Sequence, residues 1–338
     1  MKNPKPSNPT ISDVARLADV SRTTVSLVIR GNADIPAETK ERVMAAISEL
    51  GYRPTLAAQS VPTQRSGAFG FVSDEIVTTP YAGKIFEGAQ DTAWKQGKLL
   101  ILANTKNDPQ LQAAALEMMM ERQVEGIIYA TYYHRPVTPP DLLWEVPSVL
   151  LDCFVPDRSL PSVVPDEVAA AHKATSVLLE KGHKRVGFLN NRDPIPATSA
   201  RLQGYLAALA EHGIPFDQAL VTSDSSDPDG GLRSAQTLMQ LPDPPTALFC
   251  FCDRMAMGAY YALRQLNLSI PENVAVMGFD NQETIAAHLK PGLSTMELPH
   301  YEMGKWAFNY LLEQINHEGD THPVQHTIEC PYIERASV

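Results

Sequence analysis

From residue 67 onward, short apolar runs alternate with longer segments whose apolar residues recur at helical spacing. This alternation constrains the fold more than any other feature, because strands that alternate with helices form parallel sheets covered by helices on both faces. The expected strands are Ala68–Ser73, Leu99–Ala103, Gly126–Ala130, Ser148–Asp152, Arg185–Asn190, Ala247–Phe251, Val274–Phe279, 293–296 and 325–333. The expected helices are 82–97, 108–122, 167–182, 199–213, 230–240, 254–267 and 300–317. The region is therefore predicted to be α/β, with doubly wound parallel sheets.

The number of strands predicts two sheets, and therefore a core of two lobes spanning residues 67–338. Lobe one is expected at about 67–162 plus 291–324, and lobe two at about 163–290 plus 325–338. Two doubly wound lobes place a cleft at the carboxyl ends of their strands, where ligands bind.

Residues 1–54 have a different pattern, which predicts a small all-α headpiece of three short helices. Thr10 and Asp13 form a capping-box pattern, Ser21 can cap a second helix, and Gly51 ends the third. Three short helices with a tight turn between the first two is helix-turn-helix geometry. The outward face of the second helix carries Arg22, Thr23, Ser26, Leu27 and Arg30. The periodicity alone leaves open whether this face reads DNA or is merely solvated.

The charge is divided unevenly along the chain. The formal net charge is −11, yet residues 1–66 contain nine Lys and Arg against six Asp and Glu. The remaining residues contain 19 Lys and Arg against 33 Asp and Glu. A mildly basic head on an acidic body is compatible with contact between the head alone and nucleic-acid phosphates.

The segment TISDVARLADVSRTTVSLVIRGNADIPAETKERVMAAISELGYRP resembles the headpiece of the lactose-repressor family. The V-S-x-x-T-V-S recognition helix and the G-Y-x-P exit (Gly51, Tyr52, Pro54) carry the resemblance, which implies DNA binding. It also implies phosphate contacts from Thr10, Ser21, Thr24, Ser26, Thr39 and Tyr52, and base contacts from Arg22, Thr23 and Leu27. Leu27 stands where the family often has Arg and cannot grip guanine with two hydrogen bonds. We therefore expect Arg22 to carry most of the direct readout.

Residues 55–66 form the expected hinge between headpiece and core. The segment from Thr55 to Val61 is too short to hold a helix alone in water. The resemblance implies that it folds on the operator and inserts Val61 as a minor-groove wedge, with further contacts from Thr55, Ala58 and Gln59. A plain flexible linker is the alternative interpretation.

The resemblance continues through the core, which looks like the family's periplasmic-binding-protein-like domain. It implies that Arg201, in R-x-x-G-[FY], and Asp280, in G-F-D-N, grip a small-molecule effector. Carboxylates and an Arg fork at strand ends suit a polyol. The other expected effector contacts are Asp74, Tyr81, Asp152, Cys252, Asp253 and His300. A stacking face could come from Tyr81, Tyr132, Tyr133 or Trp144.

The sequence predicts a homodimeric repressor of carbohydrate-use genes that binds double-stranded, palindromic operator DNA under the control of a sugar. A purine or another metabolite acting as corepressor is the alternative, and a solute-binding protein is a weaker one. No nucleophile elbow, P-loop or dinucleotide fingerprint is present, so we expect neither an enzyme nor a cofactor. The four cysteines lack metal-ligand spacing, so no metal is expected. No apolar run reaches eighteen residues, so no membrane span is expected, and a cytoplasmic location is predicted.

Overall fold

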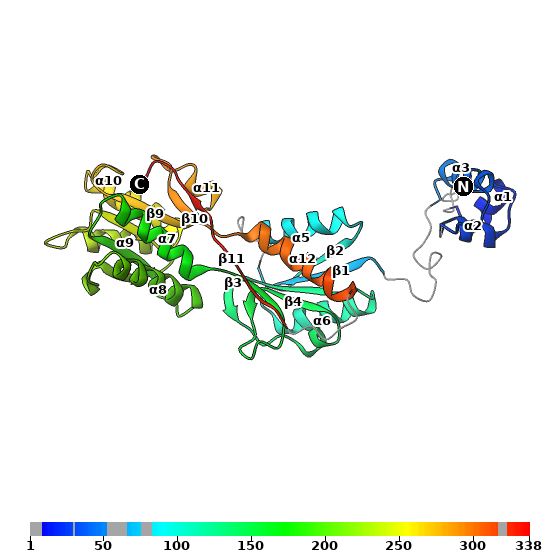
Figure 1. Cartoon of the computed structure of the whole chain (residues 1–338), viewed down its shortest axis with the longest axis horizontal. Helices are drawn as coiled ribbons and strands as arrows, with labels where there is room; N and C mark the ends of the chain where they lie inside the picture. The colour runs from blue at the N-terminus through cyan, green and yellow to red at the C-terminus, as the bar shows by residue number, and fades with distance from the viewer. Residues whose placement is uncertain (1–8, 30, 53–65, 76–82, 317–322) are drawn as a thin grey trace, which may run out of the picture. The chain divides into compact units, whose positions relative to one another are not determined.

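The computed structural model describes residues 9–29, 31–52, 66–75, 83–316 and 323–338. The chain divides into two compact units, residues 1–66 and 67–338 (Figure 1). Among the described residues, no helix is long and apolar enough to cross a bilayer, and no three metal-ligating side chains come together.

The described residues of the first unit form three mutually packed helices, α1 (Ile11–Leu17), α2 (Arg22–Ile29) and α3 (Ala37–Leu50). α1 begins at the expected capping box, in which the backbone N–H and hydroxyl of Thr10 both donate to Asp13. α3 ends at Gly51, whose φ of 61° is left-handed and therefore favours glycine. The centre of the unit is a small apolar cluster to which each helix contributes one fully buried valine, Val14, Val25 and Val43.

The second unit contains two six-stranded sheets, one in each lobe. The lobe-one sheet has the spatial order β11 (Gln325–Ile328), β5 (Ser162–Pro165), β4 (Ser148–Phe154), β3 (Ile127–Pro136), β1 (Ala68–Ser73) and β2 (Leu99–Asn104). The lobe-two sheet has the order β12 (Tyr332–Ile333), β10 (Ser294–Glu297), β9 (Ala275–Asp280), β8 (Ala247–Cys250), β6 (Val186–Asn191) and β7 (Val221–Asp224). Every pairing is parallel except that of β10 with β12.

Helices cover these sheets, so the central strands are buried on both faces and are apolar almost throughout, as in AVMGFD of β9. The lobe-one helices are α5 (Gly83–Lys95), α6 (Pro109–Glu121) and α12 (His300–Asn316), with the 3₁₀ turn η2 (Asp141–Trp144). The lobe-two helices are α7 (Glu167–Glu180), α8 (Pro196–Glu211), α9 (Pro228–Met239), α10 (Asp253–Gln265) and α11 (Glu283–Ala286), with the 3₁₀ turn η3 (Gln218–Leu220). The predicted fold class, with two doubly wound parallel lobes, is confirmed.

The assignment of the last strands to lobes was wrong. β10 was expected in lobe one but pairs with β9 in lobe two. The expected strand 325–333 is two short strands, of which β11 completes lobe one and β12 completes lobe two. The chain therefore crosses between the lobes three times, at β5 to α7, β10 to α12 and β11 to β12 (Figure 1). Alternation of strands and helices could not reveal this exchange, because either sheet can accept a short parallel strand at its edge.

Two strands were missed altogether, β5 and β7, and each has only four residues. β7 lies at the edge of its sheet and is only partly buried, so it lacks the apolar run that marked the central strands. β3 is longer than expected, and its pairing with β4 shifts register between Ala130 and Arg135. This irregularity inserts residues 131–134 beside the carboxyl end of the lobe-one sheet.

Candidate functional site

Helix α2, the expected recognition helix, presents a polar surface to solvent. Its inward side is held by Val25 and Val28, which are buried in the headpiece cluster. Ser21, Arg22 and Thr23, at its start, are exposed, and Thr24, Ser26 and Leu27 are half-buried. The helix can therefore offer side chains of the kinds that bind base edges and phosphates without disturbing its own packing.

Several expected DNA contacts also have local structural roles. The Ser21 hydroxyl accepts a hydrogen bond from the Thr24 backbone N–H at 3.0 Å and lies 2.8 Å from the Thr24 hydroxyl. Tyr52 is 8% exposed and packs in the headpiece cluster, and Thr39 is half-buried on α3. The other expected contacts, Arg30, Thr55, Ala58, Gln59 and Val61, lie outside the described residues.

A cavity of about 220 Å³ lies between the two lobes of the core. Lobe one lines it with residues of the inserted β3 segment and the end of β4, and lobe two lines it from α7, α8, the ends of β6 and β8, and the segment after β10. The polar and aromatic lining residues are Tyr132, Tyr133, His134, Asp152, Glu167, Asn191, Asp193, Arg201, Ser226, Phe251, Cys252, Arg254, Asp280 and His300. This cavity occupies the carboxyl ends of parallel strands, where doubly wound folds bind ligands.

Arg201 is the most heavily engaged side chain in the cavity and is only 3% exposed. Its Nε donates to Glu167 Oε2 at 2.6 Å, its Nη2 donates to Glu167 Oε1 at 3.2 Å, and its Nη1 donates to the Phe251 carbonyl. Its Nη1 also lies 3.6 Å from Asp280 Oδ1. The guanidinium stacks over Phe279 and Phe251, with Cζ 3.6 and 4.3 Å from the ring centroids. Burial disfavours the charged form of Arg201, but the negative charges of Glu167 and Asp280 outweigh the effect of burial and raise the pKa of Arg201.

Glu167 was missed by the sequence analysis. It lies in the first turn of α7, where an acidic residue is ordinarily explained by the helix dipole. α7 packs closely on α8, and this packing brings Glu167 to Arg201. The close approach depends on a glycine at position 204 of α8, because a Cβ there would collide with the backbone oxygen of Val168 on α7. Gly204 belongs to the same R-x-x-G-[FY] segment as Arg201, so this glycine was the available sequence signal.

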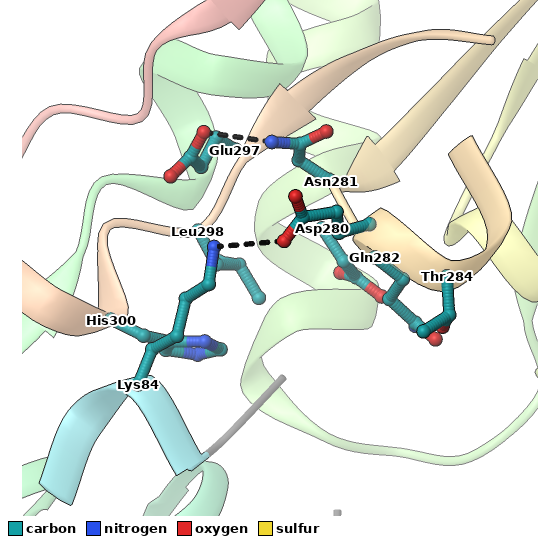
Figure 2. Close-up of a pocket in the computed structure, with 9 residues that line it drawn as sticks. Lys84, Asp280, Asn281, Gln282, Thr284, Glu297, Leu298 and His300 are labelled. Carbon is teal, nitrogen blue, oxygen red and sulfur yellow. Dashed lines mark hydrogen bonds and ion pairs between the residues drawn. The ribbon is translucent and has the colours of Figure 1, made fainter. Parts of the chain in front are cut away.

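Asp280 ends β9 with a φ of 106°, a strained value for a residue with a side chain. Its Oδ2 accepts a hydrogen bond from Gln282 Nε2 at 2.9 Å. Burial raises the pKa of Asp280 to about 6, although Arg201 and Gln282 act in the opposite direction. Asp280, Leu298 and His300 also line a smaller adjoining pocket of about 100 Å³ (Figure 2).

Asp152 faces the cavity from lobe one and is 3% exposed. Its Oδ1 has no hydrogen-bond partner among the described residues. Its backbone has a φ of 57°, and its carbonyl accepts a hydrogen bond from the Thr131 hydroxyl at 2.8 Å. Burial, together with the charges of Glu167 and Asp74, holds the pKa of Asp152 well above its ordinary value. An unsatisfied buried carboxyl group is costly, and a ligand that donates a hydrogen bond would relieve that cost.

The remaining predicted effector residues divide into two groups. Cys252 and His300 line the cavity and are almost fully buried. Asp253 does not line it, because its carboxylate accepts hydrogen bonds from the Gln282 backbone N–H at 2.6 Å and the Thr295 hydroxyl at 2.7 Å. Asp74 does not line it either and pairs with Arg135 at 2.8 Å. Tyr81 lies outside the described residues.

Of the possible stacking residues, Tyr132 and Tyr133 line the cavity, and Trp144 is exposed elsewhere on lobe one. Sequence reasoning missed His134, which lies on the inserted β3 segment. Burial lowers the pKa of His134 and so favours its neutral form. The apolar run that predicted β3 indicates neither that residues 131–134 are inserted after it nor that they lie at the cavity.

A larger depression, of about 650 Å³, lies at the opposite end of the lobe-two sheet. It is lined by residues around the amino end of β6, including Arg185, Tyr205 and Phe216. Arg185 is already paired with Asp217 at 3.4 Å and with Asp243 at 3.0 Å. Ligands of doubly wound sheets bind at the carboxyl ends of the strands, so the smaller cavity is the better candidate.

Comparison with known protein families matches nearly the whole chain. Residues 10–55 match the family described as "Bacterial regulatory proteins, lacI family". Residues 66–336 match the family described as "Periplasmic binding proteins and sugar binding domain of LacI family". The chain is therefore a two-part transcription regulator with a DNA-binding headpiece and a periplasmic-binding-protein-like core. It belongs to the LacI family of bacterial regulatory proteins, as the resemblance implied.

Individual relatives agree with this assignment. The chain is 31% identical to the ribose operon repressor of Haemophilus influenzae, over 93% of this chain and 94% of that protein. It is 32% identical to the transcriptional repressor PurR of Vibrio vulnificus, over 90% of this chain and 92% of that protein. Among solved structures, a LacI-family regulator from Rhizobium etli is 31% identical with a TM-score of 0.73, covering 81% of this chain and 99% of that one. A complex of the regulator CelR with cellobiose is 29% identical with a TM-score of 0.68, covering 98% of this chain and 100% of that one.

Proposed function

We propose that the protein is a homodimeric repressor of carbohydrate-use genes whose affinity for operator DNA is controlled by a sugar bound between the core lobes. The observation that carries the proposal is the interlobe cavity, with its buried carboxylates and guanidinium, in a chain that also has a helix-turn-helix headpiece. Carboxylate oxygens accept hydrogen bonds from hydroxyl groups, and the aromatic lining offers faces for a sugar ring. The CelR complex with cellobiose and the ribose operon repressor support a sugar ligand by likeness.

On the DNA side, we propose that α2 lies in the major groove with Arg22, Thr23 and Leu27 at base edges. Thr10, Ser21, Thr24, Ser26, Thr39 and Tyr52 are the proposed phosphate contacts. One headpiece buries little surface, so two are needed, and twofold symmetry makes the operator palindromic. We further propose that the ligand is bound and released without reaction, so that the protein acts in the cytoplasm as a sensor and not as an enzyme.

Control of DNA binding requires that the effector bind more tightly to one lobe arrangement than to the other. The cavity is lined from both lobes, so a ligand there contacts both and favours one closure. The dimer would transmit that change to the spacing of the two headpieces.

The test uses full-length protein in two stages. Duplexes are first selected from a random pool, and melting temperature is measured against sugars and against nucleobases. Operator affinity is then measured with and without each ligand that raises the melting temperature. We expect selection of a palindromic sequence and at least one sugar that changes its affinity. If only nucleobases change the melting temperature and operator affinity, the effector is a purine corepressor and the sugar assignment is wrong. If no duplex is preferred over the random pool, the proposed function is overturned.

A further inference from the structure

The charges around the interlobe cavity are not balanced. Four carboxyl groups line it, from Asp152, Glu167, Asp193 and Asp280, against the two guanidinium groups of Arg201 and Arg254. Arg254 already acts on Asp280, whose pKa it lowers. The described lining therefore has an excess of acidic groups that face a bound ligand.

Glu167 decides how much of Arg201 a ligand can reach. Arg201 is the obvious group for holding a carboxylate or phosphate, because its planar fork can donate two parallel hydrogen bonds. That fork is occupied: Nε and Nη2 both donate to Glu167, which is itself 5% exposed. Nη1 donates to the Phe251 carbonyl and lies 3.6 Å from Asp280 Oδ1, so each guanidinium nitrogen already faces an internal acceptor. An anion would have to displace Glu167 to gain the fork of Nε and Nη2.

Across the cavity, Asp152 is a lining residue whose Oδ1 is enclosed by protein and has no partner among the described residues, so it is an unused acceptor for a ligand group that reaches it. A hydroxyl or ammonium group of a ligand can donate to this oxygen. A carboxylate or phosphate cannot donate, and the burial and the neighbouring charges of Glu167 and Asp74 that raise the pKa of Asp152 would also oppose a second negative charge in this poorly solvated site.

We propose that the cavity selects uncharged or cationic polyols and rejects anionic ones, such as sugar acids and sugar phosphates, and that Glu167 sets this preference by occupying the Arg201 fork. The inference rests on the proposed function, because it names the class of sugar that the same site takes. Glu167 is thus a specificity residue that acts through Arg201.

The first experiment measures binding to full-length wild-type protein by calorimetry and melting temperature. The probes are sets that share one ring and differ in charge: glucose, glucosamine, glucuronate and glucose 6-phosphate, the corresponding galactose set, and ribose with ribose 5-phosphate. For each sugar ring that binds, we expect the neutral or amino form to bind at least about a hundredfold more tightly than the acid or phosphate form.

Each outcome has a separate meaning. If an acid or phosphate binds as well as its neutral parent, the charge preference is overturned and the sugar-sensing function stands. If no ring in the panel binds in any form, the proposed sugar function fails, and this inference fails with it.

Variants then test the assignment to Glu167. Glu167→Gln keeps the size of the side chain but releases the fork, so the ratio of acid to neutral affinity should rise about tenfold or more. Because this ratio compares two ligands on the same variant, a general loss of binding affects both affinities and leaves the ratio unchanged. Glu167→Asp keeps the charge and should keep the wild-type preference, which provides a second readout if Glu167→Gln folds poorly.

Asp193→Asn is the matched control, because Asp193 is an exposed lining residue whose change removes the same charge without freeing Arg201. If Asp193→Asn raises the ratio as much as Glu167→Gln does, the preference depends on total charge and the role given to Glu167 is wrong.

Discussion

The headpiece and the core place their candidate binding residues in opposite environments. On α2, Arg22 and Thr23 are exposed, and the packing of the helix depends on the valines of its other side. In the interlobe cavity, Arg201 and Asp152 are each 3% exposed, and Arg201 is held by several partners. The difference teaches that the exposed candidate base contacts of α2 can be altered with little effect on folding, whereas in the cavity the candidate binding residues also hold the fold together.

The largest expected effect is the loss of stability in Arg201→Met. The change removes the guanidinium but keeps much of the volume, and leaves Glu167 buried without its cationic partner. Removing one member of a buried pair costs about 3–5 kcal/mol. We expect a loss of that size in the free energy of unfolding, measured by urea denaturation of the core transition.

A double-mutant cycle with Glu167→Gln provides the control. Replacing both partners should cost much less than the sum of the two single changes, because neither charge is then left unpaired. Additive losses would show that the pair does not act as a unit and would weaken the contrast with the headpiece.

The next effect concerns pH. Asp280 has a pKa of about 6 in the folded protein against an ordinary value of 3.8. The folded state therefore retains a proton that the unfolded chain loses, and the contribution to stability declines as pH rises from about 4 to 6. The difference between these two pKa values corresponds to about 3 kcal/mol. Asp280→Asn should lack this decline, so the difference in unfolding free energy between wild type and variant should fall by about that amount from pH 4 to 6, measured by urea denaturation from pH 4 to 7.

Asp224 serves as a control of opposite sign. Hydrogen bonds from Arg233 hold the pKa of Asp224 at about 2, so its contribution is present above pH 4 and is lost as pH falls toward 2. Asp224→Asn should therefore leave the profile between pH 4 and 7 unchanged. A parallel change in both variants would mean that the slope does not come from the cavity.

Arg22→Ala tests the other side of the comparison. If Arg22 grips a base, the variant should lose about 1–3 kcal/mol of operator affinity, while its unfolding free energy stays within about 0.5 kcal/mol of wild type. Arg16→Ala is the matched control, because it removes an exposed positive charge from α1 instead of α2. Equal losses of affinity in both variants would indicate general attraction to phosphates and would contradict direct readout.

Much of the fold was visible in the sequence because it depends on local rules. Buried parallel strands such as β9 are short apolar runs, the α1 start has a capping box, and Gly51 occupies a left-handed position. The exchange of β10 and β11 between lobes was not visible, because pairing at a sheet edge depends on where distant segments meet.

The wrong lobe assignment of β10 also affected the prediction of the effector site. Asp253 follows β8 as expected, but its carboxylate accepts from Thr295, which lies on the strand that had been placed in the other lobe. Glu167 was missed for a related reason, since its partner Arg201 is 34 residues away and is reached only through packing of α7 on α8. Arg201 and Asp280 could be found, because a family motif marked each of them.

The smallest expected effect comes from changes at Ser21, which separate its role in capping α2 from its proposed role in DNA contact. Ser21 accepts the Thr24 backbone N–H and so caps α2, and it is also a proposed phosphate contact. Ser21→Ala should lower headpiece stability by about 1 kcal/mol, seen as faster hydrogen exchange of α2 amides, and should weaken operator binding. Ser21→Asp restores a cap but places a negative charge toward the phosphates, so exchange should return to the wild-type rate while DNA affinity falls further. If Ser21→Asp instead recovers DNA affinity together with slow exchange, Ser21 acts only through the helix, and stability and recognition are coupled in the headpiece as well as in the cavity.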